Sequence, residues 1–265
     1  MKAEELYEAI LPLEVVTFDE IMDVVSRLAD RVDRSYINTK YVHPLVKKGK
    51  LRRVRRGIYA VSVGGKGVTP DKVLVASKVK ERYFLGYHTA LEVHGCAYSA
   101  HNVAYVCVKP GYGFKQFTFD QYHIQPVYVA DVNVGVEKRQ YMGHVILMSS
   151  RERTFLDCLD RVEYAGGWEE ALKSLENMSG LKFDELLRLA VDSSNHFLAM
   201  KTGFILELLK KNSIYYEHLQ ESTLDTLRDH IGERPRYLVN GEMGELNKRW
   251  RLYVPLGFEE HLRGV

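Results

Sequence analysis

Histidine and glutamate side chains gather in one short stretch of the sequence, at His88, Glu92 and His94. These residue types can hold a metal ion or transfer a proton. On a helix, His88 and Glu92 share a face because they are four positions apart. His94 lies about 240° round the helix from His88 at 100° per residue, and the HExxH spacing is absent. We therefore favour a buried packing motif in which His88 caps the helix start.

Other signatures of catalysis or metal binding are also missing. The sequence has no GxSxG elbow and no GxxxxGK[ST] phosphate loop. Its three cysteines, Cys96, Cys107 and Cys158, form no CxxC pair and are expected to be buried free thiols. Arg153 and Asp157 are expected to pair on the surface of a helix. We expect no enzymatic activity, no cofactor and no bound metal.

A dense run of basic residues offers a different chemistry, the binding of phosphate. Residues 31–66 hold eleven Lys and Arg against the single acid Asp33, a local charge of +10, whereas the whole chain carries only +2. Residues 1–30 sum to −6 and residues 67–265 to −2. Such density is typical of a nucleic-acid-binding segment. The alternative is a solvated surface balanced by acids elsewhere.

Helices are expected to carry part of this basic run. Residues 3–11 have the spacing of a short helix. Thr17 and Glu20 fit a capping box that begins a second helix. The apolar stripe of that helix consists of Phe18, Ile21, Met22, Val25 and Leu28.

A third helix is expected over residues 35–48, with Ile37, Tyr41 and Leu45 on one face. Gly49 is placed to end it. Pro44 should kink this helix or divide it near Val42.

Two short β-rich runs, residues 51–54 and 58–61, flank Gly57 and predict a hairpin. Three helices followed by a basic hairpin describe a winged helix-turn-helix DNA-binding domain over residues 1–66. Its third helix would read base edges in a major groove with Ser35, Tyr36, Asn38, Thr39, Lys40 and His43. Phosphate contacts are expected from Lys47, Lys48, Arg52, Arg53, Arg55 and Arg56. For Asn38 and Thr39, capping of the helix is an equal alternative.

Residues 67–265 are expected to form a second, larger domain. Strand patterns occupy residues 103–108, 114–119, 122–129 and 144–148, and helical periodicity returns from Ser149. Ser149 and Glu152 fit another capping box. A sheet-like middle followed by helices indicates an α+β fold rather than alternating strands and helices. The fold class is therefore α+β, with an N-terminal winged helix-turn-helix followed by a larger mixed α+β domain.

Four segments together resemble the AbiE-type antitoxin and transcriptional regulator family (AbiEi-like proteins). They are residues 45–59 (LVKKGKLRRVRRGIY), 86–95 (GYHTALEVHG, with Thr89 where serine is usual), 150–157 (SRERTFLD) with the nearby Gly166-Gly167, and 202–207 (TGFILE). The resemblance implies a winged helix-turn-helix that binds operator DNA, often as inverted repeats, and represses its own operon. It also implies a C-terminal antitoxin domain that counters a nucleotidyltransferase-like toxin without needing a stable complex.

We therefore expect a DNA-binding repressor and antitoxin whose partners are double-stranded operator DNA and a cognate toxin. No membrane association is expected, and the acidic start MKAEELYEAI, unlike a signal peptide, predicts a cytoplasmic protein. One alternative is a module that docks a partner through its C-terminal domain. Its aromatic residues Tyr215, Tyr216, Tyr237, Trp250 and Tyr253 could anchor such an interface, although we favour core positions for them. The weakest alternative is a metal-dependent nuclease using His88, Glu92 or Asp157.

Overall fold

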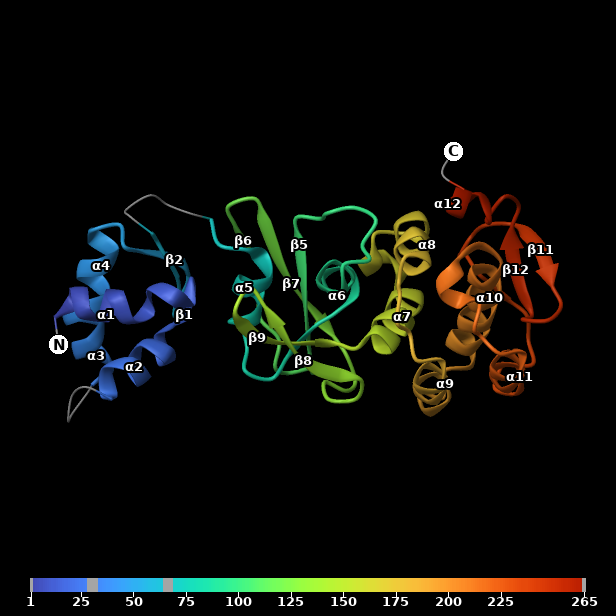
Figure 1. Cartoon of the computed structure of the whole chain (residues 1–265), viewed down its shortest axis with the longest axis horizontal. Coiled ribbons are helices and arrows are strands. Elements are labelled where there is room, and N and C mark those ends of the chain that lie inside the picture. The colour runs from blue at the N-terminus through green and yellow to red at the C-terminus, as the bar shows by residue number, and fades with distance from the viewer. Residues whose placement is uncertain (1, 28–32, 64–68, 264–265) are drawn as a thin grey trace. The chain divides into compact units, whose positions relative to one another are not determined.

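A computed structural model describes residues 2–27, 33–63 and 69–263. The chain has the mixed α+β architecture expected from the sequence (Figure 1). It divides into two compact units, which are described separately. Unit 1 comprises Met1–Phe84, Asn102–Ala130 and Arg139–Ile146, and unit 2 comprises Leu85–His101, Asp131–Lys138 and Leu147–Val265. The domain boundary expected between residues 66 and 67 lies outside the described residues, as do Leu28, Arg31 and Lys66.

Unit 1 begins with the helix α1 (Ala3–Ile10), a 3₁₀ turn (Leu11–Leu13) and the helix α2 (Phe18–Ser26). The capping box at the start of α2 is confirmed. The hydroxyl of Thr17 accepts from the Glu20 amide at 3.1 Å, and the Glu20 carboxylate accepts from the Thr17 amide at 2.8 Å. These bonds satisfy amides that have no partner in the first turn of a helix.

The third helical segment joins α3 (Arg34–Ile37), a π-helical turn η2 (Asn38–Val42) and α4 (His43–Lys47). Ile37, Tyr41 and Leu45 are buried, so the predicted apolar face is confirmed. Pro44 does not divide the helix. The backbone instead takes a wider turn in which the His43 amide donates to the Asn38 carbonyl, since Pro44 has no amide hydrogen to donate. The helix ends at Gly49, which has a φ of +71°.

A three-stranded sheet of order β1-β3-β2 completes the N-terminal part of unit 1. Its strands are β1 (Val15–Thr17), β2 (Leu51–Arg55) and β3 (Ile58–Val61). β2 and β3 form the predicted hairpin, and Gly57 in its turn has a φ of +81°. β1 was not expected, because three residues are too few to show an alternating pattern. It pairs antiparallel with β3 and brings α2 next to the hairpin turn.

The largest sheet has six strands in the order β6-β7-β5-β4-β9-β8. They are β6 (Phe117–Phe119), β7 (Tyr122–Tyr128), β5 (Val103–Val108), β4 (Phe84–Leu85), β9 (His144–Ser149) and β8 (Val136–Tyr141). The sequence VEKRQY of β8 is mostly polar, so its strand was missed. In unit 1, the short helix α5 (Lys72–Ser77) packs against β5 (Figure 1).

Unit 2 is largely helical. Its helices are α6 (Tyr87–His94), α7 (Arg151–Asp160), α8 (Trp168–Glu176), α9 (Phe183–Asp192), α10 (His196–Asn212), α11 (Glu221–Asp229) and α12 (Glu260–Arg263), with 3₁₀ turns at Val162–Ala165 and Ile214–Tyr216. A small sheet contains β10 (Arg236–Tyr237), β12 (Leu252–Pro255) and β11 (Gly244–Asn247). Trp250 is fully buried against α10, and a Cβ atom on Gly203 would lie 2.0 Å from its ring. The tryptophan therefore requires glycine at this position.

Two local expectations for α7 are wrong. The residue that caps the helix is Ser150, whose hydroxyl accepts from the Arg153 amide at 3.2 Å, rather than Ser149. Arg153 and Asp157 do pair, at 2.8 Å, but the Asp157 side chain is only 12% exposed. This burial raises the pKa of Asp157 to about 6 despite the neighbouring Arg153. The ion pair is thus part of the packed interior and not of the surface.

Candidate nucleic-acid interface

The outer face of the helix 34–47 carries the side chains predicted to read base edges. Ser35, Tyr36, Asn38, Thr39, Lys40 and His43 are all exposed. Asp33 caps the helix, since its carboxylate accepts from the amides of Ser35 and Tyr36 at 3.1 and 3.4 Å. Asn38 and Thr39 therefore lie inside the helix, and the capping interpretation of these two residues is wrong.

Lys40 lies against two aromatic rings on this face. Its ammonium group donates to the Tyr36 hydroxyl and lies 4.8 and 5.1 Å from the ring centroids of Tyr36 and Tyr41. The hydrogen bond to Tyr36 raises the pKa of Lys40. Tyr36 and Lys40 thus form a positively charged unit with limited rotamer freedom, which reduces the entropy lost when a partner binds.

The four arginines of the β2–β3 hairpin separate into two pairs. Arg53 and Arg56 are exposed, and neither has an ion pair among the described residues. Arg52 donates two hydrogen bonds of 2.8 Å to the two carboxylate oxygens of Asp120, which follows β6. The hydroxyl of Thr69 donates to the same carboxylate at 2.7 Å. Arg52 is therefore already paired, whereas Arg53 and Arg56 are available.

Aromatic residues of the loop before β6 and of β6 itself hold the second pair. The guanidinium of Arg52 lies 4.4 Å from the ring centroid of Phe119, and that of Arg55 lies 4.7 Å from Phe117 and 5.6 Å from Phe114. Guanidinium groups are attracted to aromatic faces at these distances. Sequence reasoning missed these partners because they lie about sixty residues away from the hairpin, and no local pattern marks them.

The two lysines at the end of α4 also differ. Lys47 is exposed and has no ion pair among the described residues. Lys48 pairs with Glu4 of α1 at 2.8 Å, and Lys50 contacts the same carboxylate. Hydrogen bonds from Lys48 and Lys50 lower the pKa of Glu4 to about 2. Because the Lys48–Glu4 pair is exposed to water, it contributes little stability and a phosphate could replace the carboxylate.

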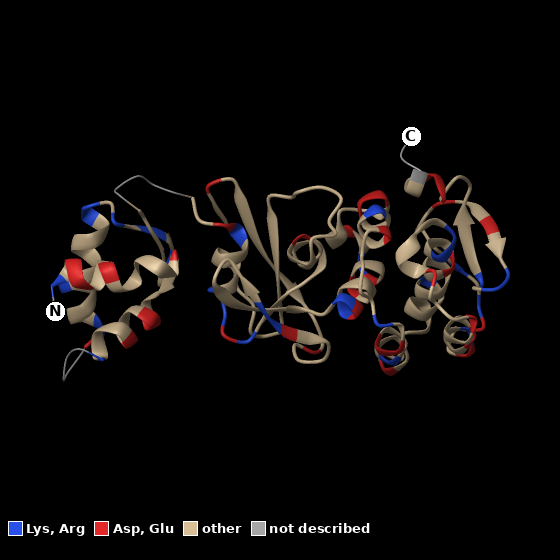
Figure 2. Ribbon diagram, viewed as in Figure 1, with Lys and Arg blue, Asp and Glu red and all other residues tan. Residues whose placement is uncertain are grey.

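A groove of about 320 Å³ lies between the helix 34–47 and the hairpin. The helix lines it with Arg34, Ser35 and Asn38, and the hairpin contributes Arg53 and Arg56. Three arginines and no carboxylate therefore line the groove. Figure 2 shows the basic residues along β2, while acidic residues lie on α1 and α2. We refer to this site as the basic groove.

The alternative catalytic cluster lies inside unit 2. His88 is fully buried, and its Nδ1 lies 3.4 Å from Glu92 Oε1, so these residues share a face as expected. Its Nε2 lies 3.0 Å from Glu170 of α8, and its ring stacks on His101 with 3.6 Å between centroids and 1° between planes. A cation in the plane of one of two parallel rings lies outside the plane of the other. This geometry suits a hydrogen-bonded network in the interior.

His88 does not cap α6. Gly86 occupies the capping position without a side-chain bond, and His88 lies in the first turn. His94 faces elsewhere, with its Nε2 3.0 Å from the Ser149 carbonyl. The structure thus brings His88 together with Glu92 but not with His94. Cys96, Cys107 and Cys158 are buried and free, as expected.

The aromatic residues of the C-terminal region are divided between core and surface. Tyr216 and Trp250 are fully buried, which matches the favoured core position. Tyr215 and Tyr237 are 47% and 52% exposed, and Tyr237 stacks on Tyr253 at 4.9 Å. No described helix is both long enough and apolar enough to cross a membrane.

No protein-family model matches the sequence, and no curated protein matches it. Among solved structures, the chain is similar to the RV2827C protein from Mycobacterium tuberculosis, with a TM-score of 0.64 and 12% sequence identity. The similarity covers 94% of this chain and 88% of that chain. At so low an identity the likeness shows a common fold and carries no information on activity. The fold is therefore shared over almost the whole length of both chains.

Proposed function

We propose that the N-terminal part of unit 1 is a winged helix-turn-helix that binds double-stranded DNA. The observation that carries this proposal is the basic groove, in which Arg34, Arg53 and Arg56 surround Ser35 and Asn38 without any carboxylate. The order of elements also supports it, since three helical segments precede a hairpin joined to a third strand. The hairpin is the wing, and the helix 34–47 is the recognition helix.

In this proposal the two kinds of contact have different roles. Exposed polar groups of the recognition helix read base edges in the major groove, using Ser35, Tyr36, Asn38, Thr39, Lys40 and His43. Arg53 and Arg56 of the wing and Lys47 and Lys48 of the helix end bind phosphates and supply salt-dependent affinity. Arg52 and Arg55 act indirectly, by fixing the wing against Asp120 and the phenylalanines.

The resemblance to AbiEi-like proteins extends this proposal to a biological role. The chain would repress its own operon and act as the antitoxin of a nucleotidyltransferase-like toxin, as a regulator and not as an enzyme. The antitoxin role rests on the resemblance of the segments 86–95, 150–157 and 202–207. Coexpression with the product of the adjacent gene tests it. Growth restored by the full chain is the expected result, and growth arrest with a nucleotidyltransferase-like neighbour would refute it.

Fluorescence anisotropy with DNA from upstream of the gene tests the DNA-binding proposal. If six phosphates are neutralised, the affinity should fall with salt concentration with a log–log slope of about −5. Arg53→Ala/Arg56→Ala should reduce that slope by about 2. Lys211→Ala/Lys248→Ala is a matched control, since both lysines are exposed and lie outside the basic segment. Equal affinity of both double variants would remove the wing from the interface.

A further inference from the structure

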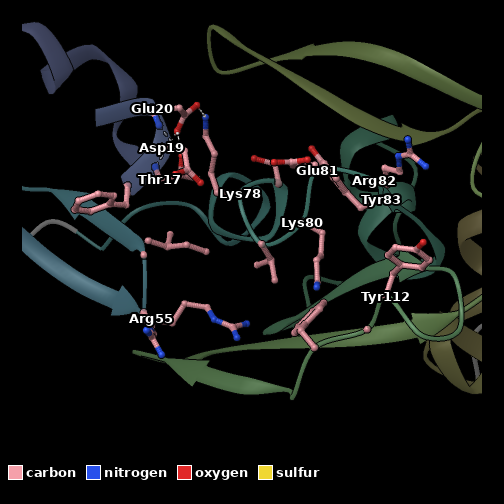
Figure 3. A pocket seen from close by; sticks show the side chains of 18 of the residues that line it. Thr17, Asp19, Glu20, Arg55, Lys78, Lys80, Glu81, Arg82, Tyr83 and Tyr112 are labelled. Carbon is pink, nitrogen blue, oxygen red and sulfur yellow. Dashed lines mark hydrogen bonds and ion pairs between the residues drawn. The ribbon is translucent and has the colours of Figure 1, made fainter. Parts of the chain in front are cut away.

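A second and larger cleft lies beside the wing within unit 1. Its volume is about 1040 Å³. The start of α2 and the wing turn 55–58 form part of its wall, and the segment 77–83 after α5 and the loop 112–114 form the rest. Figure 3 shows Arg55 on the wing, and Lys80, Arg82 and Tyr112 on the other segments. None of these other segments belongs to the residues 1–66 expected to bind DNA.

The charges of this cleft are mostly available on the basic side. Two of its carboxylates are already neutralised, since Asp19 pairs with Arg34 at 3.0 Å and Glu20 pairs with Lys78. Arg56, Lys80 and Arg82 have no ion pair among residues 2–27, 33–63 and 69–263. The free charges nevertheless include the acids Asp23 and Glu81, so the cleft is less uniformly basic than the basic groove.

The cleft is continuous with the basic groove. Phe18, Arg34, Arg56 and Gly57 line both of them. A row of cations therefore runs from the recognition helix, past the wing turn, to the segment 77–83. Duplex DNA has evenly spaced phosphates along each strand, and a row of this kind fits a continuous backbone better than it fits an isolated small anion.

We propose that this cleft is a second phosphate-binding site, in which Lys80 and Arg82 hold the sugar–phosphate backbone flanking the bases read by the recognition helix. This inference rests on the proposed DNA-binding function. Tyr112 is 62% exposed at the edge of the cleft, where its hydroxyl can donate to a phosphate oxygen. The DNA-contacting surface therefore includes residues beyond the wing, and the isolated segment 1–66 lacks part of it.

Salt titration of Lys80→Ala/Arg82→Ala tests this inference on the full chain. With DNA from upstream of the gene, the log–log slope should be less steep than that of the wild type by about 2, and the affinity near 0.1 M salt should fall roughly 10- to 100-fold. The charge-matched control Lys211→Ala/Lys248→Ala should bind as the wild type does. Equal thermal unfolding of both variants would exclude misfolding as the cause. An unchanged slope for Lys80→Ala/Arg82→Ala would overturn the inference.

Two further arms identify the source of the phosphate. A duplex trimmed at the flanks should bind the wild type and Lys80→Ala/Arg82→Ala with the same affinity, because the second contact is absent. Inorganic phosphate that raises the unfolding temperature of the wild type alone, with DNA binding equal in both, would indicate a small-anion site and overturn the inference. A wild type that binds no DNA would instead refute the proposed function itself, and Arg53→Ala/Arg56→Ala separates the two failures.

Discussion

Arg52 and Asp120 form a two-pronged ion pair in which both hydrogen bonds measure 2.8 Å. They lie sixty-eight residues apart in the sequence, and the pair joins the wing to the turn between β6 and β7. Arg52 lowers the pKa of Asp120 through these bonds. The carboxylate occupies the arginine in the way that a phosphate would.

Replacing this carboxylate should therefore strengthen DNA binding. In Asp120→Asn the amide holds Arg52 less firmly, so Arg52 becomes available to a phosphate, and one negative charge is lost near the interface. We expect severalfold higher affinity and a salt slope steeper by about 1, measured by fluorescence anisotropy. Weaker binding would mean that Asp120 serves chiefly to position the wing.

The two arginine pairs of the wing should respond differently to substitution. Arg53→Ala/Arg56→Ala should weaken DNA binding strongly with little change in thermal stability, because both side chains are exposed. Arg52→Ala/Arg55→Ala removes the contacts with Asp120, Phe117 and Phe119, so it should lower the unfolding temperature and change the salt slope less. The two variants have the same charge and differ only in these contacts. Identical effects on both measurements would contradict the division.

A buried carboxyl group should make unit 2 sensitive to pH. The pKa of Asp157 in the folded chain is about 6, above its ordinary value of 3.8. Between these values the folded state binds more protons than the unfolded state, so stability falls as the pH rises through this window. Urea unfolding at about pH 4.5 and 7.5 should show a loss smaller by about 2 kcal/mol in Asp157→Asn. The exposed control Asp192→Asn should keep the wild-type profile.

The contact between α10 and Trp250 predicts a severe effect of one added methyl group. In Gly203→Ala the new Cβ atom meets the ring at about 2.0 Å, and the overpacking should cost about 3 kcal/mol of unfolding free energy. Gly232→Ala is the matched control, since its nearest neighbour would be 3.6 Å away. Urea unfolding measures both. A stable Gly203→Ala variant would show that Trp250 can move aside.

Local patterns predicted much of the fold. The capping box of Thr17 and Glu20 depends on residues three apart, and the face of Ile37, Tyr41 and Leu45 depends on one helical period, so a short window contains the whole signal. The second capping box was misplaced by one residue because Ser149 and Ser150 are adjacent and equally suitable. Polar edge strands such as β8 have no apolar alternation to detect.

The candidate site was predictable only in part, for the same physical reason. The sequence identified the basic residues and the helix that presents them, since both are local. It did not show that Asp120 occupies Arg52, nor that Lys80 and Arg82 lie on the cleft beside the wing turn. Those relationships come from pairing between distant segments, and a single sequence contains no record of it.

The π-helical turn before Pro44 changes how the recognition helix can be compared with others. Such a turn contains one more residue than an α-helical turn, so it is equivalent to a one-residue insertion. Side chains after Val42 are displaced round the axis relative to Ser35 and Asn38. An ungapped alignment with a straight recognition helix would assign His43 and Lys47 to the wrong positions. Any base contact transferred from another protein to this part of the helix needs a gap of one residue.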